Sequence, residues 1–173
     1  MFEKVSLFSI DAYKVKIDNW SEEHKDRILD LVSDEWWNDH YTDFHRYNNG
    51  EIPPYANELL QILNPYLEEF FSKNQISRIT SLWCQRCRSG DFHGPHDHGS
   101  FGYSAVFYAN MDIGVHSGTQ FFCPFPNDHG QKENIIVSVQ EGDLIIFPSH
   151  VLHMGTLHYD PNKERVIFSF NFL

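Results

Sequence analysis

The sequence has few cations, few cysteines and no long apolar run. It holds 13 lysines and arginines against 24 acidic residues, a net charge of −11. Phosphate groups repel such a chain, so we expect no nucleic-acid partner. No apolar stretch approaches the roughly 20 residues of a membrane-spanning helix. Charged residues also interrupt the N-terminal segment where a secretory signal would need an apolar stretch. We therefore expect neither membrane insertion nor export.

The cysteine count bears on the cellular compartment. Three cysteines are an odd number for a disulfide framework and are typical of a reducing cytoplasm, where we place the protein. The length of 173 residues favours a single domain over residues 1–173, because two domains would have thin cores.

Aromatic residues are abundant, at 16% of the chain, and they favour β-structure around a large apolar interior. Glycine, proline, asparagine and aspartate separate short β-rich runs in the second half. These runs predict strands at 76–88, 102–110, 118–123, 134–139, 143–147 and 164–172. Such spacing is typical of a sandwich or barrel. We predict a mainly β, α+β fold with a jelly-roll core over 76–173 and a helical buttress over 1–75.

The first half of the chain alternates between strand, helix and loop signals. Residues 2–17 alternate loosely and predict one or two strands. Ser21 is a candidate cap for a helix with a stripe of apolar residues up to Trp36. The polar segment 38–54 predicts a loop, and long loops of this kind often form lids over a site. A second helix follows, and Pro65 is expected to interrupt it and start a new helical run.

The densest chemistry lies in a histidine-rich segment. His96 and His98 are two residues apart, so in an extended chain their side chains project to the same side and Asp97 projects to the other. Two imidazoles can bind one divalent ion with a third ligand from elsewhere. His153 is the best candidate, with His150 as a competitor in the same segment. Alternatively, loops rich in His, Gly and Asp are often solvated turns.

A second feature is an arginine at the start of an apolar strand. Alternation places Arg165, Ser169 and Asn171 on one face of that strand and the phenylalanines on the other. If the polar face lines the barrel, Arg165 is a buried cation that needs an anion, and a carboxylate ligand would pair with it. The alternative is an edge-strand arginine in solvent.

These residues together resemble the 2-oxoglutarate/Fe(II)-dependent oxygenases. The resemblance runs from Trp83 to the C-terminus. It is nearest to a group common in marine bacteria and their phages, and the chain also resembles the prolyl-hydroxylase branch. Gly90 stands six residues before His96, as in the family stretch leading to the first iron ligand. Phe147-Pro148 precedes His153 in the same way as the family dipeptide precedes the distal ligand.

The resemblance implies a double-stranded β-helix fold, Fe(II) and 2-oxoglutarate as cofactors, and dioxygen as oxidant. It implies hydroxylation of an unidentified substrate with release of succinate and CO2. The iron ligands would be His96, His98 and His153. The distal carboxylate of 2-oxoglutarate would pair with Arg165 and Tyr108. Further co-substrate contacts would come from Gln85, Ser169 and Asn171.

One residue departs from the family pattern. The usual triad is His-x-Asp/Glu with a distal histidine, whereas the carboxylate position here holds His98. Asp97 could replace it only if the strand bulged. Two alternatives therefore remain open. One is a cupin-type enzyme with three histidine ligands that does not use 2-oxoglutarate, and the other is a non-catalytic jelly-roll binding protein.

The other histidines carry weaker expectations. His93 is a candidate fourth ligand or substrate contact, although a solvated loop position is the simpler expectation. His116, His129 and His158 lie in turn-like segments, and we expect no catalytic role for them. The aromatic composition would also allow a homodimer.

Overall fold

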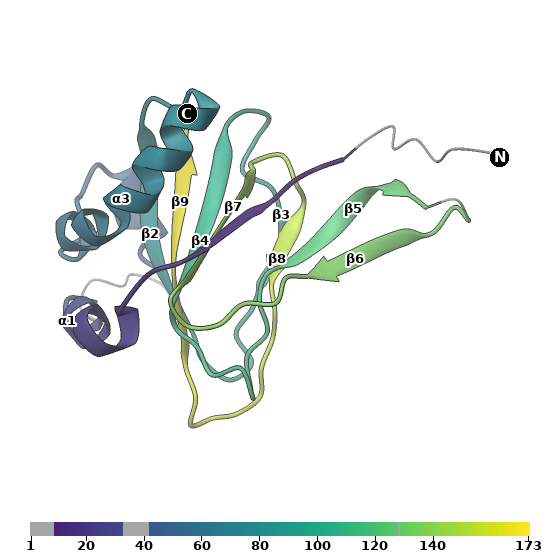
Figure 1. Ribbon diagram of the computed structural model, residues 1–173. Helices are drawn as coiled ribbons and strands as arrows, with labels where there is room; N and C mark the ends of the chain where they lie inside the picture. The colour runs from purple at the N-terminus through teal and green to yellow at the C-terminus, as the bar shows by residue number, and fades with distance from the viewer. Residues whose placement is uncertain (1–8, 33–41, 128) are drawn as a thin grey trace.

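The computed structural model describes residues 9–32, 42–127 and 129–173. Two antiparallel sheets face each other (Figure 1). The larger sheet has the strand order β1-β7-β4-β9-β2, and the smaller has the order β3-β8-β5-β6. The strands are β1 (Tyr13–Lys16), β2 (Ile79–Cys87), β3 (His93–His96), β4 (Tyr103–Asn110), β5 (Gln120–Pro126), β6 (Lys132–Ile136), β7 (Asp143–Pro148), β8 (His153–Gly155) and β9 (Arg165–Phe172).

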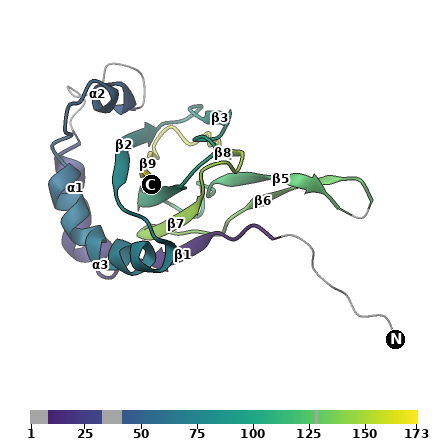
Figure 2. The same cartoon turned by 90° about the horizontal axis from the view of Figure 1, so that it is seen from above.

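Helices cover the outer face of the larger sheet. The helical elements are the π-helical turn η1 (Trp20–His24), α1 (Lys25–Asp30), α2 (Phe44–Asn48) and α3 (Ala56–Asn74). Figure 2 shows α1 and α3 on the side away from the smaller sheet, whereas α2 lies beside the edge strand β2. Among the described residues, no helix is long and apolar enough to cross a bilayer.

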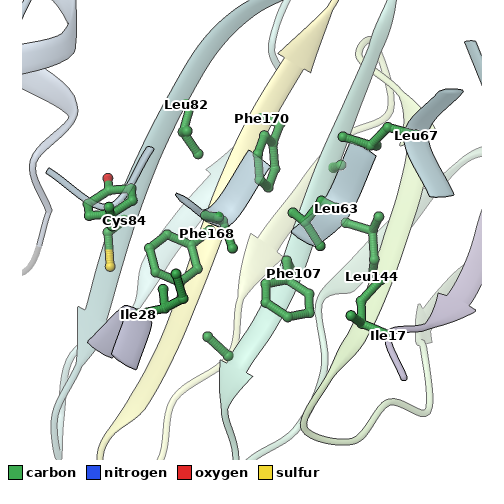
Figure 3. Close-up of a cluster of buried hydrophobic side chains, with 14 of the residues drawn as sticks. Ile17, Ile28, Leu63, Leu67, Leu82, Cys84, Phe107, Leu144, Phe168 and Phe170 are labelled. Atoms are coloured by element: carbon green, nitrogen blue, oxygen red, sulfur yellow. The ribbon is translucent and has the colours of Figure 1, made fainter. Parts of the chain in front are cut away.

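The outer core lies between these helices and the larger sheet (Figure 3). Leu59, Leu63 and Leu67 recur every fourth residue and so form one apolar stripe along α3. This stripe packs in the same buried cluster as Phe168 and Phe170 of β9. Aromatic side chains of β9 that point away from the smaller sheet therefore anchor the helical layer.

The inner core lies between the two sheets. Tyr108, Phe147 and Ile167 belong to the larger sheet and are buried together with Phe121 of β5. Because both faces of the larger sheet are covered, its central strands are apolar on both sides, as in the run Leu144–Phe147. This arrangement confirms the predicted mainly β fold with helices in front.

Two predicted helix boundaries are wrong. Pro65 does not interrupt α3, which is continuous from Ala56 to Asn74. A proline removes one helical hydrogen bond, but Pro65 is exposed, so water can serve the freed carbonyl of Gln61. Ser21 does not cap a helix, because the helical turn begins at Trp20 and Ser21 lies inside it. The hydroxyl of Ser21 donates to Oε1 of Glu141 at 2.8 Å.

The predicted loop 38–54 contains the helix α2. Residues 38–41 lie outside the described residues. Thr42 forms an isolated bridge with Gln85 of β2, and its hydroxyl donates to the carbonyl of Cys84 at 3.0 Å. Asp43 is buried and accepts hydrogen bonds from the hydroxyl of Tyr55 and the N–H of Cys84. These bonds attach α2 to the edge of the larger sheet.

Candidate metal centre and active site

The three histidines of the predicted triad meet at one end of the smaller sheet. His96 of β3 lies directly opposite His153 of β8 in an antiparallel pair. His98 follows β3, and its backbone N–H donates to the carbonyl of Ser149 at 2.9 Å. One ring nitrogen of each histidine lies within 4.8 Å of the others. Neither β3 nor β8 was predicted, because both are short and neither contains a β-branched residue.

The second ring nitrogen of each histidine is held by an acceptor. Nδ1 of His96 lies 2.7 Å from the carbonyl of Gly94, and Nδ1 of His153 lies 2.8 Å from the carbonyl of Val151. Nδ1 of His98 lies 2.6 Å from Oδ1 of Asn171. Since these partners can only accept, each Nδ1 carries the proton, and each neutral ring has its lone pair on Nε2.

The Nε2 atoms fit a divalent cation. Those of His96 and His98 are 3.1 Å apart, and with both protons on Nδ1 no hydrogen lies between them. Two facing lone pairs repel unless a cation binds both. Ligands at right angles around an ion, at the bond length of about 2.1 Å seen for imidazole on zinc, would be about 3.0 Å apart. Three imidazoles suit iron, zinc or copper.

Burial favours the neutral form of His153 and His98. Burial, with a contribution from the neighbouring His96 and His98, lowers the pKa of His153 to about 3, although the hydrogen bond with the carbonyl of Val151 acts in the opposite direction. Burial also lowers the pKa of His98, although the hydrogen bond with Asn171 acts in the opposite direction. Metal ligation requires neutral imidazole, so the lowered pKa values of His98 and His153 favour cation binding.

Asn171 supports the cluster from the larger sheet. Its Oδ1 accepts from His98 and also from the hydroxyl of Ser104 at 2.9 Å. Its Nδ2 donates to the hydroxyl of Ser81 at 2.7 Å. The amide therefore has partners on both ends and fixes the ring of His98. This contact was not predicted, since the sequence suggested only a co-substrate contact for Asn171.

The two competing ligand candidates lie outside the cluster. Asp97 is exposed and accepts the N–H of Gly99 at 3.0 Å. His150 is also exposed. Among the described residues, the group able to hold a metal ion consists of His96, His98 and His153.

His93 is closer to this group than a solvated loop residue would be. Its ring stacks on His96 with a centroid separation of 3.8 Å. Its Nδ1 lies 2.9 Å from Nε2 of Gln85, which is buried on β2. Burial, followed by the neighbouring His96 and His98, lowers the pKa of His93 to about 4. His93 and Gln85 thus form a second layer beside the three histidines.

Arg165 and Tyr108 are buried on the neighbouring strands β9 and β4. The guanidinium donates to the carbonyl of Ser117 and to the hydroxyl and carbonyl of Thr156, each at 2.9 Å. All three acceptors are neutral, so Arg165 is a buried cation beside uncharged groups. The hydroxyl of Tyr108 lies 2.8 Å from that of Thr119 and accepts the Thr119 N–H at 2.9 Å. Burial raises the pKa of Tyr108, which stays protonated.

A pocket of about 530 Å³ opens beside the histidines. Thr42, Phe44 and His45 line one side, so part of the predicted loop 38–54 borders the site. Phe44 packs edge-on against Trp83 with centroids 5.0 Å apart, and Trp83 lies 5.5 Å from the ring of His98. The pocket joins an aromatic wall to the three clustered histidines.

A jelly-roll with converging imidazoles is typical of non-haem metal enzymes. The chain belongs, within this class, to the family described as "Putative 2OG-Fe(II) oxygenase", whose model matches residues 81–171, more than half of the sequence. The cofactors of this family are Fe(II) and 2-oxoglutarate. The match favours an oxygenase over the cupin-type and non-catalytic alternatives. Curated protein sequences give no significant match.

Solved structures share the fold at low sequence identity. The non-heme alpha-ketoglutarate-dependent epimerase SnoN from nogalamycin biosynthesis is 12% identical, with a TM-score of 0.65 over 95% of this chain and 78% of that one. A prolyl-4-hydroxylase of Pseudomonas putida is 14% identical, with a TM-score of 0.61 over 95% and 92%. A 2OG-Fe(II) oxygenase family protein of Burkholderia pseudomallei is 15% identical, with a TM-score of 0.53. That last match covers 70% of this chain and 56% of the Burkholderia protein. The fold is therefore the double-stranded β-helix of 2-oxoglutarate oxygenases.

Proposed function

We propose that this oxygenase binds Fe(II) through Nε2 of His96, His98 and His153 and uses it to hydroxylate a substrate held in the adjacent pocket. The observation that carries the proposal is the convergence of three Nε2 lone pairs whose Nδ1 partners are all acceptors. Together with bound 2-oxoglutarate, the iron would supply dioxygen activation, with succinate and CO2 as co-products. The protein would supply orientation and shielding.

Arg165 would hold the distal carboxylate of 2-oxoglutarate. A buried guanidinium whose partners are neutral attracts a carboxylate strongly, because little water screens the pair. Tyr108 would turn its hydroxyl from Thr119 to the same carboxylate. Gln85 and Ser169 are both buried and occupy the adjacent strands β2 and β9, where they would contact the rest of the co-substrate.

The pocket beside the histidines would receive the substrate. Trp83 and Phe44 provide an apolar wall. Among the described residues that line the pocket, Asp97 is the one carboxylate, and there is no lysine or arginine. The composition of this lining suits a neutral or cationic group near the metal more than an anionic one.

Anaerobic titration of the Fe(II)-loaded protein with 2-oxoglutarate tests this function. We expect the weak visible charge-transfer band of an iron-chelated keto acid to appear and saturate. In Arg165→Ala the band should appear only at a much higher concentration of 2-oxoglutarate, because the distal carboxylate loses its cationic partner. Lys163→Ala is the matched control: Lys163 is a nearby cation on the surface, paired with Asp112, and its loss should leave the titration unchanged.

A protein that binds iron tightly but shows no band at any 2-oxoglutarate concentration would contradict the proposal. It would indicate a three-histidine site that works without the keto acid.

A further inference from the structure

Three buried side-chain nitrogens, one of Arg165 and two of nearby histidines, have no hydrogen-bond partner among the described residues. They are Nε of Arg165, Nε2 of His116 and Nδ1 of His158. The three side chains are 3%, 5% and 3% exposed. Buried polar atoms are nearly always paired, so several unpaired ones in one place call for an explanation.

These nitrogens belong to one cluster. The rings of His116 and His158 pack edge to face with centroids 4.5 Å apart. Ser117, next to His116, accepts a hydrogen bond from Arg165, and so does Thr156, two residues before His158. The β4–β5 and β8–β9 loops, which carry the two histidines, lie at the same end of the sheets in Figure 1. Both loops are thus attached to the guanidinium.

The remaining hydrogen bonds of the histidines fix what each free nitrogen offers. Nδ1 of His116 accepts the N–H of Asp112 at 3.0 Å, so the neutral ring carries its proton on Nε2. Burial, with His158 and Arg165 nearby, lowers the pKa of His116 to about 4, which keeps the ring neutral at pH 7. Nε2 of His158 donates to the carbonyl of Cys87 at 3.1 Å, which leaves a lone pair on Nδ1 in the neutral ring. The cluster therefore presents two N–H donors and one acceptor.

We propose that His116 and His158 complete, with Arg165, the binding site for the distal carboxylate of 2-oxoglutarate. The carboxylate accepts the N–H of Arg165 Nε and the N–H of His116 Nε2. A water molecule donates one hydrogen to the carboxylate and the other to Nδ1 of His158. All three nitrogens are then paired. This inference rests on the proposed function and adds two binding residues to it.

The site would also set the choice of keto acid. A keto acid without a distal carboxylate leaves the donors of Arg165 and His116 unpaired, and a site built for hydrogen bonding rejects such ligands strongly. The chain should therefore bind 2-oxoglutarate much more tightly than 2-oxobutyrate.

Two near-isosteric variants remove one free nitrogen each. His116→Asn keeps an oxygen that can accept the Asp112 N–H and removes Nε2. His158→Gln keeps an N–H for the Cys87 carbonyl and removes Nδ1. We would measure the dissociation constant of 2-oxoglutarate for the Fe(II)-loaded protein under argon by calorimetry. We expect weakening of about tenfold for His116→Asn, which loses a bond to a charged group, and about threefold for His158→Gln.

The controls separate this inference from the proposed function. Arg165→Gln should weaken binding more than either histidine variant. His129→Asn changes an exposed histidine in the β5–β6 hairpin and should leave binding unchanged. If Arg165→Gln loses binding while both histidine variants bind like the wild type, the histidine inference is wrong and the arginine anchor stands. If Arg165→Gln also binds like the wild type, the anchor itself is wrong.

Nitrogen-15 NMR of the unmodified protein gives a test that needs no variant. On addition of succinate, the proposed co-product, which retains the distal carboxylate of 2-oxoglutarate, the resonances of Arg165 Nε, His116 Nε2 and His158 Nδ1 should all shift as hydrogen bonds form. A shift at Arg165 alone would overturn the role of the two histidines.

Discussion

The orientation of His98 depends on one distant side chain, whereas the other two histidines are oriented locally. His96 and His153 each use the carbonyl two residues earlier in their own strand or turn. His98 uses Asn171 at the far end of the chain. Residues that orient metal ligands typically change metal affinity by about 10–100-fold when they are replaced.

We therefore expect Asn171→Ala to weaken Fe(II) or Zn(II) binding by about 10–100-fold. The ring of His98 would lose the acceptor that holds its Nδ1 proton. Competition with a chromophoric chelator measures this affinity. Asn110→Ala is the control, because Asn110 donates to the carbonyl of Glu164 away from the histidines. Unchanged metal affinity in Asn171→Ala, with a normal circular dichroism spectrum, would refute the orienting role.

Part of the site could be predicted from the sequence. The pair His96 and His98 followed from strand periodicity, and the side on which Arg165 lies followed from alternation in an apolar strand. The contact of His93 with Gln85, and that of Asn171 with His98, could not be predicted. Both depend on which strands become neighbours, and a single sequence does not show strand pairing.

At the scale of elements, the longest helix is stabilised by packing despite its proline. The leucine stripe of α3 is buried continuously on both sides of Pro65. Burying one leucine contributes about 1.5–3 kcal/mol, which is comparable to the cost of about 3 kcal/mol for a proline in a helix. The burial of three leucines therefore outweighs the cost of one proline. This is why the prediction that Pro65 interrupts the helix was wrong.

Pro65→Ala should accordingly stabilise the protein by about 1 kcal/mol or more. Alanine restores the hydrogen bond to the carbonyl of Gln61 and has the best helix propensity. Urea denaturation measures the change in the free energy of unfolding. Glu68→Ala, at another exposed position of α3, should change it by less than about 0.5 kcal/mol. Destabilisation by Pro65→Ala would mean that the proline fits a bend required for packing.

Tertiary contacts also decide which of the strands form. The six long or apolar strands were predicted close to their observed positions, because β-rich runs bounded by turn residues identify them. The short strands β3 and β8 form because they pair with each other, and β8 also pairs with β5. Their partners, and not their own residues, give them their conformation.

On the scale of the whole molecule, two apolar cores lie on either side of the larger sheet, and the histidine cluster lies beside the inner one. His153 packs edge-on against Phe147, with ring centroids 4.7 Å apart. Phe147 belongs to the inner core between the sheets. A cation at the histidines would join β3 to β8 beside this core, and we expect metal binding to stabilise the fold.

Removal of metal should lower the melting temperature. A ligand at one hundred times its dissociation constant adds about 2.7 kcal/mol to stability, if it binds only the folded state. Calorimetric scans with excess Zn(II) and with a chelator should show this difference in the wild type. His153→Ala should melt at the same temperature in both. A metal-induced rise that persists in this variant would place the ion elsewhere.

The amide of Asn171 presents an oxygen on one edge and an N–H on the other. Its neighbours Ser81 and Ser104 are hydroxyls, which can donate or accept. A half-turn of this amide would replace the acceptor now facing position 98 with a donor, and the serines would adjust by rotating their hydrogens. The same scaffold can then serve either an imidazole or a carboxylate at position 98. The net charge around the metal can thus change through one substitution, without rebuilding the shell behind it.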